Sequence, residues 1–166
     1  LNPSSAASDV YKRQIKNIDA WYSELSNNGL DAIVINTSGC GTTVKDYHHM
    51  FQGTEHEEKA KVIAGLTKDI SEILVELELP DRAENDINVA YHSACSLQHG
   101  QQISNSPKDI LKKCGYKISE PKNSHLCCGS AGTYNLLQPK ISQELKNRKI
   151  QSLDCLLYTS DAADDG

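Results

Sequence analysis

The chain has 166 residues, 38% of them hydrophobic and 5% aromatic, and a net charge of −5. This length predicts one domain with a real core, and the negative charge argues against a nucleic-acid-binding protein that relies on phosphate contacts. The longest purely apolar run, residues 32–35, is far too short to cross a membrane. No secretion signal opens the chain, so its six cysteines are better interpreted as reactive thiols or metal ligands than as disulfides.

The two ends of the chain resemble a translated sequencing adapter. Residues 4–14 and 155–164 can be encoded by opposite strands of one DNA sequence, which evolution rarely produces. We therefore expect residues 1–14 and 155–166 to be non-native and exclude them from the prediction of the fold. Residues 15–154 are then expected to be an internal segment of a longer protein.

Hydrophobic periodicity predicts alternating helices and strands in the first half of this segment. A buried strand is expected over residues 32–35, followed by a turn over residues 36–41 that contains Cys40. Helices are expected over residues 15–28, 44–50 and 56–78. The longest of them carries one apolar stripe that runs from Ile63 to Leu77.

The polar loop at residues 80–86 is the expected internal boundary. Strands are predicted over residues 87–91 and 116–119, and helices over residues 106–113 and from about Thr133 onward. The first of these helices should have Ser106 as its cap, Pro107 in its first turn and Gly115 just past its end.

These strand–loop–helix units predict an α/β protein with a short parallel or mixed sheet flanked by helices. Ligands bind at the loops that follow the strands of such sheets. Cys40, Cys95 and the pair Cys127 and Cys128 are all expected in loops of that kind.

The cysteines are the residues expected to carry the chemistry. Cys127 and Cys128 precede a glycine-containing run, residues 129–132, that allows the backbone to turn tightly and expose both sulfurs. Adjacent cysteines are poorly placed for a mutual disulfide, whereas thiolates on a flexible loop suit an iron–sulfur cluster, zinc or a redox dithiol. Cys114, near a helix end, is instead expected to be a small core residue.

Three histidines lie close to these cysteines in the sequence. His92 and His125 precede Cys95 and Cys127, so their rings could donate hydrogen bonds to a ligating sulfur. His99 could complete a zinc site with Cys95 and the cysteine pair. The remaining histidines are expected to be solvated helix residues: His48, His49 and His56.

Three stretches of sequence together resemble the cysteine-rich CCG domain family. They are residues 36–41, residues 92–100 and residues 125–134, and they occur in the family's order. Within the family, the Ser-Leu-Gln-His-Gly and Cys-Cys-Gly-Ser-Ala-Gly-Thr-Tyr runs favour the iron–sulfur subunits of glycolate oxidases. The resemblance implies two tandem repeats, of which residues 15–83 are the C-terminal part of the first and residues 84–154 the N-terminal part of the second.

The resemblance also implies a function. The ligands would be Cys40, Cys95, Cys127 and Cys128, and the cofactor an iron–sulfur cluster of the 4Fe–4S type. The chain would be an electron-transfer subunit of an oxidoreductase acting on 2-hydroxy acids. It would pass electrons from flavin-containing partner subunits, which oxidise glycolate to glyoxylate, towards a membrane acceptor, and would lie in the cytoplasm at the inner face of the membrane. No catalytic residue is expected in this chain. The flavin chemistry would lie on the partner subunits, since the chain has no Gly-x-Gly-x-x-Gly fingerprint.

One departure and three alternatives accompany this interpretation. Heterodisulfide reductase-type repeats end in Cys-x-x-Cys, where this chain has Thr37-Ser38-Gly39-Cys40, so its first repeat has one ligand fewer. The alternatives are a lactate-utilisation CCG protein, a heterodisulfide reductase-like enzyme acting on a small thiol, and a zinc-stabilised module that docks flavin subunits.

Overall fold

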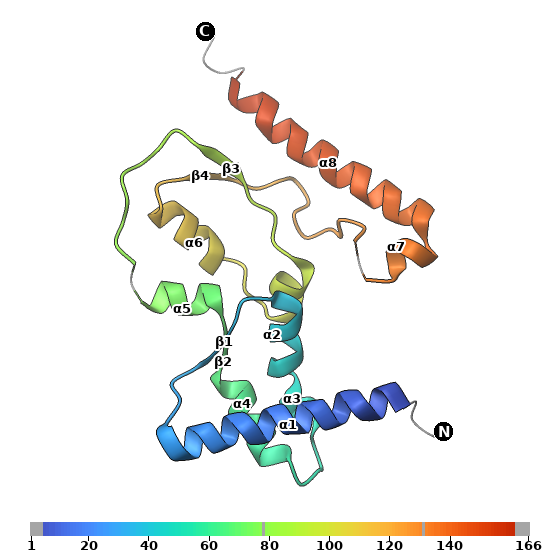
Figure 1. The fold of residues 1–166 in the computed structure, drawn as a ribbon. Coiled ribbons are helices and arrows are strands. Elements are labelled where there is room, and N and C mark those ends of the chain that lie inside the picture. Colours follow the sequence, from blue (N-terminus) through green and yellow to red (C-terminus); the bar gives the residue numbers. More distant parts are fainter. Residues whose placement is uncertain (1–4, 78, 131, 162–166) are drawn as a thin grey trace. The chain divides into compact units, whose positions relative to one another are not determined.

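The computed structural model describes residues 5–77, 79–130 and 132–161 (Figure 1). The chain divides into two compact units, the first ending at Ile73 and the second beginning at Leu74. Each unit contains its own pair of parallel strands. Within the described residues, no helix combines the length and the apolar character needed to cross a lipid bilayer.

The first unit contains a two-stranded parallel sheet surrounded by helices. Its elements are α1 (Ser5–Asn28), β1 (Ile33–Ile35), α2 (Ser38–Lys45), α3 (Tyr47–Met50), α4 (Glu57–Leu66), β2 (Thr67–Asp69) and the start of α5 (Ile70–Glu76). β1 pairs with β2 so that Ile33 faces Thr67 across the sheet. The predicted strand at residues 32–35 is therefore confirmed as β1.

Helix α1 ends where the sequence predicts and begins earlier. Its last residue is Asn28, and Gly29 follows with φ +80°, a left-handed conformation that suits glycine at a helix end. At the other end α1 starts at Ser5 rather than near residue 15, because no glycine or proline interrupts residues 5–28.

The prediction of a single helix over residues 56–78 is wrong. Strand β2 separates α4 from α5, with Thr67 and Asp69 buried in the unit. Both buried side chains are satisfied: Thr67 Oγ1 donates to the carbonyl of Ile63 at 2.8 Å, and Asp69 Oδ1 accepts from Ser71 Oγ at 2.6 Å. The apolar stripe spans this break because α4 and α5 each carry part of it, so periodicity did not reveal the strand.

Three further expectations for the first unit are corrected. The turn predicted at residues 36–41 is helical from Ser38, which places Cys40 in the first turn of α2 and not in a loop. The helix predicted over residues 44–50 is divided at Asp46 between α2 and α3. His56 is half-buried rather than solvated, with its ring edge-on to Phe51 at 6.1 Å between centroids.

The core of the first unit lies between α1, α3 and α4 (Figure 1). Phe51 is at its centre, fully buried, with the ring of Tyr47 edge-on at 5.8 Å. The other buried apolar residues are Ile18, Ile33, Val44, Ala60 and Ile63.

The second unit repeats the strand–helix–strand pattern. Its elements are β3 (Asn88–Ala90), the π-helix η1 (Ser96–Gly100), α6 (Ser106–Lys113), β4 (Lys117–Ser119), α7 (Tyr134–Leu137) and α8 (Pro139–Asp161). β3 and β4 are parallel, with Val89 facing Ile118, and α6 contacts β4 while α8 contacts β3. The predicted parallel pairing is confirmed, but the strands form two separate pairs rather than one sheet.

The helix boundaries of the second unit differ in detail from prediction. The N-cap of α6 is Asn105, one residue before the predicted Ser106, and Pro107 lies in the first turn as expected. The last predicted helix is two helices, because Pro139 has no backbone N–H with which to continue α7 and instead begins α8. Cys114, expected in the core, is half-buried at the end of α6.

Candidate functional site

Three of the four predicted cysteine ligands line one cavity in the second unit. The cavity has a volume of about 630 Å³, and its walls carry the side chains of Cys95, Cys127 and Cys128 together with His92. Cys127 and Cys128 are half-buried, and Cys95 is exposed to the cavity's open side. The tertiary structure thus brings together thiols from the segment after β3 and from the loop after β4.

Cys95 is held by the short helix that follows it. It is the N-cap of η1, and the preceding carbonyl of Ala94 accepts hydrogen bonds from the N–H groups of Leu97 and Gln98 at 3.0 and 2.9 Å. Leu97 and Ile103 are buried and anchor the segment in the unit. Cys95 therefore has a fixed backbone, although its side chain is exposed.

Gly129 fixes the loop that carries the adjacent cysteines. Its φ is +85°, and its α-carbon lies so near α8 that a Cβ would be 2.3 Å from the carbonyl oxygen of Ser142. The N–H of Gly129 donates to Sγ of Cys127 at 3.3 Å. A glycine is required here on two grounds, conformation and space, and the resulting turn directs a backbone donor to the Cys127 sulfur.

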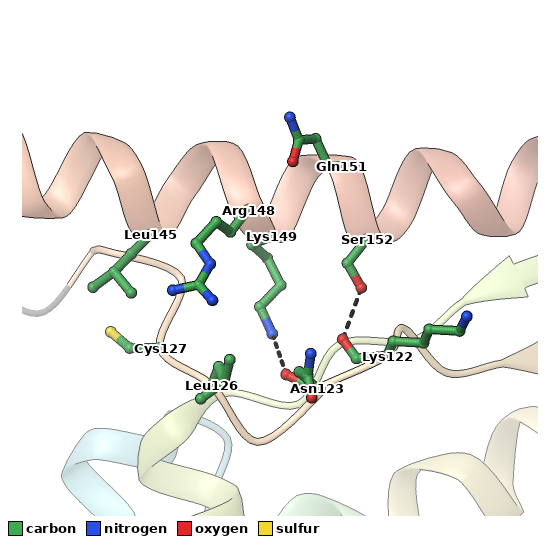
Figure 2. A pocket seen from close by; sticks show the side chains of 9 residues that line it. All are labelled: Lys122, Asn123, Leu126, Cys127, Leu145, Arg148, Lys149, Gln151 and Ser152. Carbon is green, nitrogen blue, oxygen red and sulfur yellow. Dashed lines mark hydrogen bonds between the residues drawn. The ribbon is translucent and has the colours of Figure 1, made fainter.

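Helix α8 holds the other end of the same loop. Lys149 Nζ donates to the carbonyls of Asn123 and Ser124 at 3.1 and 3.3 Å, and Ser152 Oγ donates to the carbonyl of Lys122 at 2.8 Å. Figure 2 shows the bonds of Lys149 to Asn123 and of Ser152 to Lys122, which lie in the wall of a smaller pocket of about 170 Å³ that Cys127 also lines. The loop from Lys122 to Gly129 is therefore attached to α8 at several points.

The Cys95 thiol holds its proton more strongly than a free cysteine does. Partial burial, followed by the neighbouring Cys127 and Cys128, raises the pKa of this thiol. Because a metal or cluster ligates the deprotonated form, binding at Cys95 would release a proton.

The histidines are not equivalent in the structure. His92 lines the thiol cavity, and its Nδ1 is buried without a hydrogen-bond partner among the described residues. Burial, followed by the positive charge of Lys149, lowers the pKa of His92, so its ring is neutral at pH 7. His125 is exposed, and its carbonyl is 3.2 Å from His99 Nε2, which is a hydrogen bond when Nε2 carries the proton.

The remaining predicted ligand, Cys40, lies in the first unit, exposed in the first turn of α2. Among the described residues, no three side chains of His, Cys, Asp or Glu are grouped closely enough to hold a single metal ion. A cluster distributes its thiolates over several iron atoms. Three thiols around one cavity fit that ligand chemistry, with Cys95, Cys127 and Cys128 as the residues that would hold it.

Sequence reasoning did not identify the residues of α8 that support the loop. The apolar residues Leu137, Ile141, Leu145 and Ile150 recur along the predicted helix, but in the structure only Leu145 of these four is not exposed. The face towards the cysteine loop carries Ser142, Leu145, Lys149 and Ser152, which recur at the three- and four-residue spacing of one helix face. That spacing of polar residues was the available signal.

Part of the chain that includes this site matches a known protein family. The cysteine-rich domain family called CCG matches residues 89–158, which include Cys95, Cys127 and Cys128. The glycolate oxidase iron–sulfur subunit of Escherichia coli (strain K12) is 36% identical over 144 residues, covering 86% of this chain and 35% of that protein.

Two other similar proteins are not named as glycolate oxidase subunits. The lactate utilization protein A of Anoxybacillus flavithermus is 29% identical over 126 residues, covering 74% of this chain and 53% of that protein. An uncharacterized iron–sulfur protein of Methanococcus maripaludis is 31% identical over 134 residues, covering 80% of this chain and 24% of that protein. The chain thus spans between about a quarter and about half of these relatives. No solved structure matches the chain.

Proposed function

We propose that the chain is part of an iron–sulfur electron-transfer protein, because its residues 89–158 match the cysteine-rich domain family called CCG. Cys95, Cys127 and Cys128 hold a cluster in the second unit, and a fourth thiolate comes from a part of the protein outside these residues. The cavity that the three cysteines line is the observation that carries this proposal. When bound, the cluster accepts and releases one electron at a time.

The chain's own residues prepare the cysteines for this role. Gly129 keeps a backbone N–H directed at Sγ of Cys127, and hydrogen bonds to ligating sulfurs set the reduction potential of such centres. Lys149 and Ser152 hold the loop against α8, so the sulfurs change position little between oxidation states. Rigid ligands favour electron transfer because little reorganisation accompanies each step.

We further propose a glycolate oxidase-type complex as the setting. Its flavin-containing subunits oxidise glycolate to glyoxylate, and this chain passes the electrons towards a membrane acceptor from the cytoplasmic side. The support is the 36% identity to a glycolate oxidase iron–sulfur subunit. A role in lactate utilization is the second candidate, supported by the 29% identity to lactate utilization protein A.

The proposed domain organisation follows from the same resemblance. Residues 15–83 form the end of a first cysteine-rich repeat and residues 84–154 the beginning of a second, with residues 1–14 and 155–166 derived from an adapter. In this organisation Cys40 belongs to the first repeat and serves a separate centre. His92 and His125 remain proposed hydrogen-bonding partners of the ligating sulfurs.

Anaerobic analysis of iron, acid-labile sulfide and zinc in the purified full-length protein, which includes the fourth thiolate, tests the proposal. We expect iron and sulfide in equal amounts, with a visible absorption band that bleaches on reduction. Stoichiometric zinc with no redox-active absorption would contradict the proposal and favour the docking module. A mixed disulfide on Cys127 or Cys128, detected by mass spectrometry, would instead favour thiol chemistry.

A further inference from the structure

Lys149 is a buried cation in the wall that supports the cysteine loop. Its exposed fraction is 6%, and its Nζ donates two hydrogen bonds, to the carbonyls of Asn123 and Ser124. An ammonium group has three donors, and Lys149 makes no ion pair with a carboxylate of the described residues. Burial of a charge is unfavourable unless an opposite charge compensates it.

The thiol centre is the candidate for that opposite charge, because one of its cysteines shares a pocket with Lys149. Cys127 lines the cavity with Cys95 and Cys128, and it also lines the smaller pocket that contains Lys149 (Figure 2). On the other side, His92 lines the thiol cavity, and the charge of Lys149 contributes, after burial, to the lowered pKa of its ring. Lys149 is therefore a buried positive charge beside the wall that carries Cys127.

We propose that Lys149 is an electrostatic positioning residue that raises the reduction potential of the centre held by Cys95, Cys127 and Cys128. This inference rests on the iron–sulfur function proposed above. Reduction adds one electron, supplied in the complex by a reduced flavin partner, and makes the centre more negative by one charge while no bond forms or breaks. A fixed positive charge therefore favours the reduced state, and burial protects this effect from screening by salt.

Arg148 occupies the same pocket in a different environment. Its side chain extends from α8 towards the loop (Figure 2) but is exposed to solvent. Because water and salt screen exposed charges, Arg148 should contribute less than Lys149. Comparing Arg148 with Lys149 therefore tests an exposed and a buried positive charge on the same helix and in the same pocket.

The test is a spectroelectrochemical titration of the full-length protein after anaerobic reconstitution with iron and sulfide. Lys149→Gln keeps a donor for the loop carbonyls and removes the charge. We expect it to lower the equilibrium constant for reduction about tenfold, a shift of ~59 mV for a one-electron couple. Lys149→Arg keeps the charge and should restore most of the potential.

Two control variants separate charge from anchoring. Ser152→Ala removes another side-chain anchor of the loop without changing charge, and Lys140→Gln removes an exposed charge at the start of α8. Neither should shift the potential. A shift in Ser152→Ala as large as that in Lys149→Gln would overturn the proposal, because anchoring alone would then explain both.

Arg148→Glu covers the case in which Lys149→Gln does not fold. It introduces a negative charge into the pocket while both hydrogen bonds of Lys149 remain, and it should lower the potential. An unchanged potential in Arg148→Glu, or in a folded Lys149→Gln, overturns the electrostatic role of this pocket and leaves the cluster assignment intact. Failure of the full-length wild-type protein to bind iron overturns the proposed function instead.

Discussion

The backbone of Gly129 is in direct contact with Ser142 of α8. Oγ of Ser142 donates a 2.6 Å hydrogen bond to the carbonyl of Gly129, and a Cβ on Gly129 would lie 2.3 Å from the carbonyl oxygen of Ser142. The contact joins the residue after the two adjacent cysteines to a helix that begins ten residues later in the chain. It explains why glycine follows the cysteine pair in structural terms.

Gly129→Ala should therefore disturb the site more than an ordinary glycine substitution. The new methyl group meets backbone that cannot move away, and the left-handed φ is strained for alanine, so we expect a loss of about 1–3 kcal/mol in the free energy of unfolding and loss of bound iron. Urea unfolding and iron analysis measure the two effects. Gly29→Ala is the matched control, because its φ is also left-handed but nothing lies within 4 Å of the added Cβ. Equal losses in the two variants would contradict the role of Ser142.

Single serine substitutions of the three cavity cysteines should each reduce the iron content. Serine preserves size but replaces a soft thiolate with a poor ligand for iron. We expect Cys95→Ser, Cys127→Ser and Cys128→Ser to lose most of the visible absorption after anaerobic reconstitution. Cys114→Ser is the control, since Cys114 does not line the cavity. Full iron content in any of the three variants would remove that cysteine from the ligand set.

The core of the first unit predicts a large effect for one aromatic residue. Phe51 is fully buried against Tyr47, so Phe51→Ala should lower the free energy of unfolding by about 3–5 kcal/mol through lost burial and a remaining cavity. The adjacent Met50 is exposed, and Met50→Ala should change stability by less than about 0.5 kcal/mol. Thermal unfolding of both variants compares them directly, and similar melting temperatures would contradict the packing.

The ion pair between α1 and α4 predicts an alkaline dependence of stability. Lys59 Nζ lies 2.6 Å from Asp19 Oδ1, and this hydrogen bond raises the pKa of Lys59 from its ordinary value of 10.5. A raised pKa means that the folded state holds the proton more tightly. The contribution of the pair is therefore complete below pH 10.5 and lost as the pH rises through the folded-state value.

Melting temperatures measured between neutral and strongly alkaline pH check this expectation. Lys59→Met should show a smaller decrease above pH 10.5 than the wild-type chain, and Lys61→Met, which alters an exposed lysine of the same helix, should follow the wild type. The effect is expected to be small, because both partners are partly exposed. A larger decrease in Lys59→Met than in the wild type would reverse the assigned sign.

Several elements could be predicted because their signals are local. Asn28 followed by Gly29 ends a helix in any context, and Pro107 in a first turn with Gly115 after the last turn marks both ends of α6. β2 could not be predicted from such signals. Thr67 and Asp69 are polar residues within an apparently helical stripe, and the strand exists because β1 pairs with it across the core.

The candidate site divides in the same way between sequence and structure. The identities of Cys95, Cys127 and Cys128 as chemically important residues were available from their types and spacing, because a thiol pair before glycine is informative by itself. The sequence did not show which of these cysteines line the same cavity. Cys40 was predicted to be a ligand on the same grounds, yet it lies in the first unit and within a helix.

The sequence by itself determined the helix ends at Asn28 and Lys113, the strand candidates and the thiol chemistry, since each depends on the properties of neighbouring residues. Only the tertiary structure decided that Lys149 is buried, that Ser142 contacts Gly129 and that Cys95 and Cys127 line one cavity. These relationships join residues separated by many positions along the chain. They arise because the folded chain packs α8 against the cysteine loop and places the loops that follow β3 and β4 side by side, which no local run of residues specifies.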